Sequence, residues 1–148
     1  MEINKSAEKS KRTYRFKVGK NMLNPMGTLH GGELVKEYDN AAGYTAVKYS
    51  EGRVVTAAIK EVNFKKKVTE GQTVEIRTKV FHVGRSSIHI HAAGYIVSDN
   101  ELLEKIGTAY LIFVAIDDDY NPRISPNLFF ETEEARNQAE KLKKMYEL

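Results

Sequence analysis

A carboxylate inside a predicted helix is the feature of this sequence with the clearest chemical potential. Between residues 33 and 49, apolar side chains recur at helical spacing. The residues that surround Asp39 on this helix are small or apolar: Gly32, Val35, Ala42, Gly43 and Ala46. Partial shielding from water would strengthen the Asp39 carboxylate as a base, and small neighbours leave room for a substrate. The alternative is local pairing, with Lys36 or with backbone at a subunit contact.

Two glycines, Gly31 and Gly32, stand just before this helix. Glycines leave backbone N–H groups accessible, and the start of a helix favours negative charge, so the pair predicts an oxyanion hole for acyl transfer. The acid and the N–H donors together would form a hydrolytic pair, in which the acid activates water or attacks directly. The alternative is a glycine-rich loop that only packs tightly.

The elements that must position these groups follow from periodicity. Alternation predicts a strand over 12–18, a central strand over 53–64, and further strands over 73–83, 86–98 and 106–116. An amphipathic helix is expected from Glu133, with Thr132 as its N-cap. One long helix cannot cover both faces of a sheet, so we expect the sheet to wrap around it and to pair with a second subunit.

This order predicts an α+β fold with three parts. Residues 1–11 are expected to be a flexible N-terminal arm, residues 12–130 a single domain, and residues 131–148 a C-terminal helix. The 148-residue chain has no Cys, which excludes disulfides, thiolate metal sites and a cysteine nucleophile. It also has no apolar run long enough to cross a bilayer and no secretory signal, so a cytoplasmic location without membrane contact is expected. The net charge of +3 is mild, and the one lysine run, 65–67, is read as a solvated turn rather than an anion site.

Several other groups are weighed and set aside. His89 and His91 share one strand face, but a metal would need a third ligand, and they are expected to face solvent or a subunit contact. His30 beside the glycines is read as shaping the loop rather than as a general base. Ser86 and Ser87 lack the G-x-S-x-G context of a nucleophile, no phosphate-binding loop occurs, and 117–119 lacks the spacing of a calcium loop.

Four groups of residues then resemble one family, in order and spacing over about residues 12–120. The first is Asn24-Pro25-Met26-Gly27-Thr28-Leu29-His30-Gly31-Gly32-Glu33-Leu34 with Tyr38-Asp39. The others are Gly52-Arg53-Val54-Val55-Thr56 with Val62-Asn63-Phe64, then Val83-Gly84-Arg85-Ser86-Ser87-Ile88, then Phe113-Val114-Ala115-Ile116-Asp117. Together they resemble the hotdog-fold acyl-CoA thioesterases, the bacterial acyl-CoA hydrolases related to the cytosolic long-chain enzyme of brain.

The resemblance implies a hotdog dimer, assembled further as a trimer of dimers, that hydrolyses acyl-CoA to free acid and coenzyme A. No metal or other cofactor is implied, coenzyme A being part of the substrate, and no nucleic acid. Asp39 matches the catalytic acid. Asn24 or Thr28 matches a second catalytic group, which acts from the opposite half of the dimer. The turn of Gly84, Arg85, Ser86 and Ser87 matches the contact with coenzyme A, and Val55 and Thr56 match the substrate pocket.

The sequence departs from the family pattern at three places. His30 stands where many bacterial members have Phe, Lys67-Val68 replaces an expected proline, and Lys60 replaces a common acid. Two other functions stay open at this point. The domain would bind acyl-CoA as a sensor without cleaving it, or it would act as a dehydratase that uses His30. Neither the acyl chain length nor the role of Asp39, as nucleophile or base, follows from the sequence.

Overall fold

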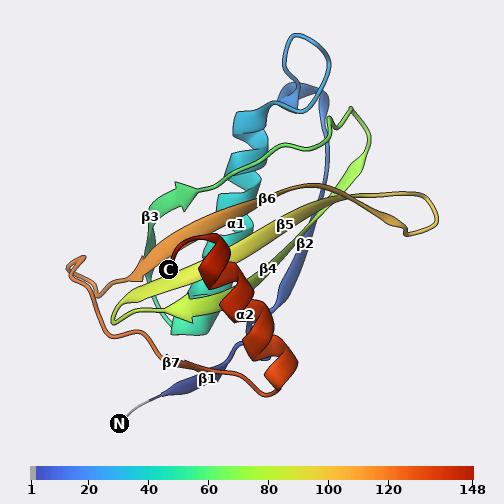
Figure 1. Ribbon diagram of the computed structural model, residues 1–148. Helices are drawn as coiled ribbons and strands as arrows, with labels where there is room; N and C mark the ends of the chain where they lie inside the picture. Colours follow the sequence, from blue (N-terminus) through green and yellow to red (C-terminus); the bar gives the residue numbers. More distant parts are fainter. Residues whose placement is uncertain (1–2) are drawn as a thin grey trace.

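Five antiparallel strands form the main sheet of the computed structural model, which describes residues 3–148 (Figure 1). The order across the sheet is β2-β4-β5-β6-β3. These strands are β2 (Arg12–Lys17), β3 (Val54–Lys60), β4 (Thr73–Val83), β5 (Ser87–Val97) and β6 (Leu103–Ala115). Their bounds fall within four residues of the predicted ones, β3 ending four residues early and β6 beginning three residues early. The longer strands alternate between two faces, as the sequence pattern requires.

One long helix, α1 (Gly31–Ser50), packs against one face of this sheet, which we call the inner face. The main core lies between them and includes Tyr38 and Ala42 of α1 and Ile76, Ile90 and Leu111 of the sheet. The predicted architecture, an antiparallel sheet around one long helix, is therefore confirmed.

The C-terminal helix α2 (Glu133–Met145) lies across the opposite, outer face of the sheet (Figure 1). As predicted, Thr132 is its N-cap, and the Thr132 side chain accepts a hydrogen bond from the Ala135 N–H at 3.1 Å. Ala139 packs with Phe81 and Tyr110 in a second, smaller core. The strands therefore separate two environments, one under each helix.

The N-terminal segment differs from the flexible arm that its polar sequence predicted. It contains a strand, β1 (Asn4–Ser6), which pairs in parallel with β7 (Asn127–Phe129), followed by a short 3-10 helix, η1 (Glu8–Ser10). The Glu8 carboxylate accepts hydrogen bonds from the backbone N–H groups of Glu131 and Thr132. Ser10 Oγ accepts a hydrogen bond from the Val80 N–H at 3.0 Å. The N-terminal segment is therefore held by contacts with residues distant in sequence, which its local composition does not reveal.

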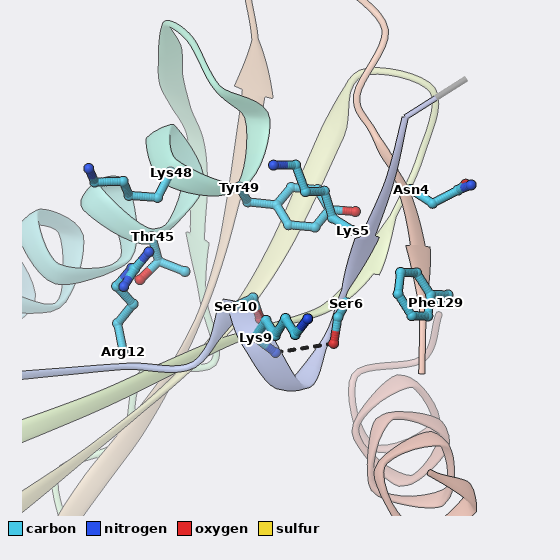
Figure 2. A pocket seen from close by; sticks show the side chains of 10 residues that line it. All are labelled: Asn4, Lys5, Ser6, Lys9, Ser10, Arg12, Thr45, Lys48, Tyr49 and Phe129. Atoms are coloured by element: carbon cyan, nitrogen blue, oxygen red, sulfur yellow. Dashed lines mark hydrogen bonds between the residues drawn. The ribbon is translucent and has the colours of Figure 1, made fainter. Parts of the chain in front are cut away.

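A hollow of about 270 Å³ lies between this segment and the end of α1 (Figure 2). Lys5, Lys9 and Lys48 are among the side chains that line it. Lys5 is paired with Glu51 at 2.8 Å, and positive charge near a helix C-terminus is favourable in itself. The basic character of this hollow therefore follows from its place at the end of α1.

Strand β3 lies at the edge of the sheet and not, as predicted, in its centre. It pairs with β6 alone among the described strands, and most of its residues are exposed. Val55 and Ile59 are 38% and 36% exposed. The apolar residues that suggested a central strand therefore lie on an edge strand, where they are exposed in the single chain.

The segment after β3 is fixed by a close approach to β6. Asn63 exchanges backbone and side-chain hydrogen bonds with Thr108, and the Lys65 N–H donates to the Ile106 carbonyl. A Cβ atom on Gly107 would collide with the Asn63 carbonyl oxygen. The contact therefore requires glycine at position 107, and it places the next residue, Phe64, near the start of α1.

Candidate active site

Asp39 lies on α1, half-buried, and is held by a side chain from β3. Thr56 Oγ1 donates a hydrogen bond to Asp39 Oδ1 at 2.8 Å. The pairing of β3 with β6 shifts register between Thr56 and Ala58, and such a bulge changes the direction in which a side chain points. The sequence had placed Thr56 in the pocket without a role toward the acid. No local signal could have shown this contact, since the two residues are on separate elements.

A second carboxylate of α1 lies where the sequence did not predict it. Glu37 is buried, with 7% of its surface exposed, although charged side chains are seldom buried. The Tyr14 hydroxyl of β2 donates a hydrogen bond to Glu37 Oε2 at 2.8 Å, and this bond raises the pKa of Tyr14. Glu37 thus joins helix to sheet, while Asp39 faces the side that is open to solvent.

The start of α1 is shaped by His30. The helix begins at Gly31, two residues before the predicted start, and His30 is its N-cap. His30 Nδ1 accepts a hydrogen bond from the Gly32 N–H at 2.8 Å, so one of the two predicted oxyanion donors already has a partner. The Gly31 N–H has no hydrogen-bond partner within residues 3–148. The prediction that His30 shapes the loop is confirmed, and the free donor at this helix end is Gly31.

A pocket of about 330 Å³ opens beside Gly31. Thr28, Leu34, Phe64 and the lysine run at 65–67 are among its lining residues. Phe64 is 55% exposed. Its ring lies so close to Gly31 that a Cβ atom added to Gly31 would be in van der Waals contact with the ring. The lysine run thus lies at a pocket and not on an isolated turn. The pocket combines an apolar wall, a free backbone donor and positive charge.

Asn24 and Thr28, the two candidates for a second catalytic group, lie together in the loop before α1. Asn24 Nδ2 donates to Thr28 Oγ1 at 2.9 Å, and Asn24 Oδ1 accepts from the N–H groups of Met26 and Thr28. Gly27, with φ of 82°, completes this turn. Thr28 lines the pocket beside Gly31, so the structure brings three of the predicted residues to one place.

Within one chain, Asp39 lies away from the pocket beside Gly31. It follows Gly31 by eight helical residues, which at the rise of an α-helix separates them by about 12 Å along the axis. A base and an oxyanion donor must both lie within about 3 Å of the reacting group. One chain therefore does not bring the acid and the Gly31 donor to the same carbonyl.

The turn predicted to contact coenzyme A lies at the other end of α1. The Gly84 N–H donates to the Ser87 carbonyl and to Ser87 Oγ, and Arg85 is exposed. The Arg85 carbonyl accepts from the Ser125 N–H, and the next carbonyl, of Pro126, accepts from the Tyr49 hydroxyl. The helix has 20 residues and is about 30 Å long, so this turn and the glycine pair of one chain lie at opposite ends of it.

The two histidines of β5 lie beneath α2 and not, as expected, toward solvent or a subunit contact. His89 is buried, and its ring nitrogens lie 2.6 Å from Tyr110 Oη and 3.0 Å from Ser87 Oγ. The ring of His91 lies beside Tyr146, at the end of α2. Burial lowers the pKa of each histidine to about 4. Within residues 3–148 no group of three or more His, Asp or Glu side chains is placed to hold a metal ion.

The sequence model of the thioesterase superfamily matches residues 26–112, more than half of the chain. The chain belongs to this superfamily. The match contains both the glycine pair and the Asp39–Thr56 pair.

Curated relatives support the same assignment. The chain is 26% identical to the cytosolic acyl coenzyme A thioester hydrolase of Mus musculus over 123 residues, which cover 81% of this chain. This chain spans only about a third of the length of that relative, 32%. An uncharacterised acyl-CoA thioester hydrolase of Zymomonas mobilis is 34% identical over 100 residues, which are 67% of each chain.

Solved structures share the fold over nearly the whole chain. The acyl-CoA hydrolase of Staphylococcus aureus, in complex with butyryl coenzyme A and coenzyme A, has a TM-score of 0.84 at 27% identity. The match covers 97% of this chain and 92% of that one. The same enzyme has been solved as three alanine variants, of an Asn, an Asp and a Thr. An apo-hexameric acyl-CoA thioesterase has a TM-score of 0.89 at 27% identity, over 98% of this chain and 94% of its own. None of the helices in the described part of this chain is long and apolar enough to span a membrane.

Proposed function

We propose that this protein hydrolyses acyl-CoA thioesters to a free acid and coenzyme A, with Asp39 as its catalytic carboxylate. The observation that carries the proposal is the hydrogen bond from Thr56 to Asp39 in a member of the thioesterase superfamily. The relatives named as acyl-CoA thioester hydrolases and the neighbour bound to butyryl coenzyme A support this substrate class.

The substituted residues of the S. aureus enzyme support the choice of site residues. Its Asn and Asp are 15 residues apart, and its Asp and Thr are 17 apart. Asn24, Asp39 and Thr56 have the same residue types at the same separations. Asn24 is therefore the better candidate for the second catalytic group, and Thr28 holds its amide in place.

The chemistry needs a base and an oxyanion donor. The Asp39 carboxylate removes a proton from water, whose oxygen adds to the thioester carbonyl carbon while the carbonyl electrons move onto oxygen. The Gly31 N–H stabilises that oxyanion. When the tetrahedral intermediate collapses, the C–S bond breaks, and the thiolate of coenzyme A leaves and takes up a proton. In the other route, Asp39 attacks the carbonyl itself, and water then hydrolyses the mixed anhydride.

The distances along α1 favour a site built from two chains. The acid of one subunit would meet Gly31 and Asn24 of the other, because one chain separates them by about 12 Å. The exposed edge of β3, with Val55 and Ile59 uncovered, suits pairing with a second copy. These features support a homodimer, and the hexameric thioesterases among the structural neighbours support its further assembly, which we propose is a trimer of dimers.

The remaining assignments rest on the same reasoning. The turn at Gly84, Arg85, Ser86 and Ser87 would bind the pyrophosphate of coenzyme A, since exposed arginine and turn N–H groups favour phosphate. Coenzyme A then enters only as part of the substrate, with no separate cofactor. A cytoplasmic location is supported by the cytosolic relatives.

A panel of acyl-CoAs from short to long chains, assayed with a thiol reagent, tests the proposal. Release of free coenzyme A by the wild type, and its loss in Asp39→Asn, is the expected result. Tight acyl-CoA binding by calorimetry without any turnover would instead support a sensor, and hydration of crotonyl-CoA would support a dehydratase. A single turnover in H₂¹⁸O tests for direct attack, because ¹⁸O in the Asp39 carboxylate with an unlabelled product acid requires a mixed anhydride that water hydrolyses at the Asp39 carbonyl.

A further inference from the structure

A recess of about 360 Å³ on the outer face of the sheet, which we call the basic groove, has no role in the thioester site. Four cationic side chains line it: Lys11, Arg77, Lys79 and Lys105. Arg12 also borders it, but the Arg12 guanidinium lies over the Tyr44 ring of α1. Thr78 bonds to Thr45 of α1 on the inner face, so its neighbours Arg77 and Lys79 point to the outer face. The groove and Asp39 are therefore on opposite sides of the sheet.

The charges of the groove are not balanced by the protein. No carboxylate lines it. Arg77 is paired with Glu75, but that carboxylate is shared with Arg15. Within the described residues, Lys11, Lys79 and Lys105 have no carboxylate within 4.0 Å. Unlike the hollow at the end of α1, the groove lies over strands, so no helix dipole accounts for its charge.

Burial increases the cost of this imbalance. Lys79 is half-buried, and burial, followed by repulsion from Lys11, lowers the pKa of Lys79. Burial, followed by repulsion from Lys79 and Lys105, lowers the pKa of His91 to about 4. At neutral pH the His91 ring is therefore uncharged. A ligand with negative charge would relieve the repulsion among the lysines and would meet a neutral imidazole able to form a hydrogen bond.

We propose that the basic groove is a binding site for a small polyphosphate anion, with Lys79 and Lys105 as its principal cations. Lys79 of β4 is in register with His91 of β5, and Lys105 of β6 is in register with Tyr95 of β5. The two lysines are therefore about 10 Å apart across the sheet and about 13 Å apart along the strands. A single phosphate does not reach both, whereas two or three linked phosphates do. The floor of the groove is Ala93, 6% exposed, whose small side chain leaves the depth that a flat surface for a macromolecule lacks.

Two sources carry this chemistry. A free compound of the pyrophosphate or nucleoside diphosphate type is one. The other is a coenzyme A molecule distinct from the one whose pyrophosphate the turn at Gly84 to Ser87 would bind. The second source rests on the proposed function, whereas the first does not.

The test is calorimetric titration of the full-length protein with pyrophosphate, tripolyphosphate, adenosine 3′,5′-bisphosphate and coenzyme A, at low and at 150 mM salt. The key variant is Lys79→Gln/Lys105→Gln. Its matched control is Lys141→Gln/Lys144→Gln, which removes the same charge from exposed positions on α2. Lys105→Gln alone keeps the test valid if the half-buried Lys79 cannot be replaced without unfolding, which thermal melting would show.

We expect the groove variant to weaken binding by at least about 10-fold, because charged hydrogen bonds to the anion are lost. The control variant should weaken binding by less than about 2-fold. Groove-dependent binding of pyrophosphate and tripolyphosphate identifies the free source. Groove-dependent binding of coenzyme A and the bisphosphate alone identifies coenzyme A as the source. Equal effects of both variants, or no binding of any of the four at 150 mM salt, would overturn the proposal. Binding does not depend on turnover, so the result stands apart from the thioesterase assay.

Discussion

The two faces of the main sheet carry different chemistry on the same strands. The inner face packs against α1 in an apolar core, and the Asp39–Thr56 pair lies where α1 meets the edge strand β3. The outer face is only partly covered by α2, and it holds neutral histidines and unpaired lysines. The side chains of two residues adjacent in sequence thus lie on different faces of the sheet, as Thr78, bonded to Thr45 of α1, and Lys79, in the basic groove, show.

Because side chains along a strand point alternately to the two faces, residues that are adjacent in sequence can serve different functions. If the faces are independent, substitutions on one should leave the properties of the other unchanged. Substitutions on either face therefore test that independence.

Replacement of the acid should give the largest effect. Asp39→Asn keeps the shape of the side chain but removes the base, so kcat should fall by about 10²- to 10⁴-fold. Steady-state kinetics on the best acyl-CoA of the panel measures this. The affinity of the outer face for pyrophosphate should not change. Wild-type activity in the variant would contradict both the proposed role of Asp39 and the assignment of the thioester chemistry to the inner face.

The buried histidines of the outer face should make the stability of the protein depend on pH. His89 and His91 titrate in the folded protein at a pKa of about 4, below the ordinary value of 6.5. Between these values the unfolded chain binds more protons, so the free energy of unfolding should decrease as pH falls from about 6.5 to 4 and be constant above that window. After allowance for residual exposure, the loss is on the order of 2 kcal/mol per imidazole.

Urea unfolding at pH 7, 6, 5 and 4 measures this slope, and the variants His89→Gln and His91→Gln should each reduce it. The inner-face variant Asp39→Asn serves as the control and should keep the slope of the wild type. A slope that is unchanged by both histidine variants would show that other groups cause the acid sensitivity.

Removal of the partner of the acid should have a smaller effect. Thr56→Val keeps the shape but deletes the hydrogen bond to Asp39, and kcat should decrease by about 10-fold with little change in KM, because a bond to a charged group is lost. Thr56→Ser, which keeps the hydroxyl, should recover most of the activity. If serine fails where valine also fails, the role of Thr56 is packing rather than orientation of the acid.

The smallest effect is expected at the cap of α2. Thr132→Ala removes the acceptor for the Ala135 N–H and should lower the free energy of unfolding by about 1 kcal/mol. Thr132→Ser is the matched control and should retain most of the stability. Thioesterase activity should be unchanged in both, and an activity loss in Thr132→Ala would show that α2 communicates with the inner face.

Local pattern was sufficient for most of the fold. The alternation over 73–83 and the periodicity over 33–49 gave the strand and the helix, because each element follows from its own residues. The edge position of β3 was missed, because apolar residues at an uncovered edge look like those of a buried strand. The order of the N-terminal segment was missed too, since it comes from Glu8 meeting Glu131 and Thr132.

The sequence alone was sufficient for the five strands of the main sheet, the two α-helices, the residue types of the candidate site and, through its motifs, the family. What those residues touch depends on the tertiary structure. It paired Thr56 with Asp39, occupied the Gly32 N–H with His30 and buried the histidines of β5 under α2. It also gathered lysines from separate segments into one groove. The physical reason is that each of these contacts joins groups on different elements or at a helix end, and their geometry depends on how the elements pack.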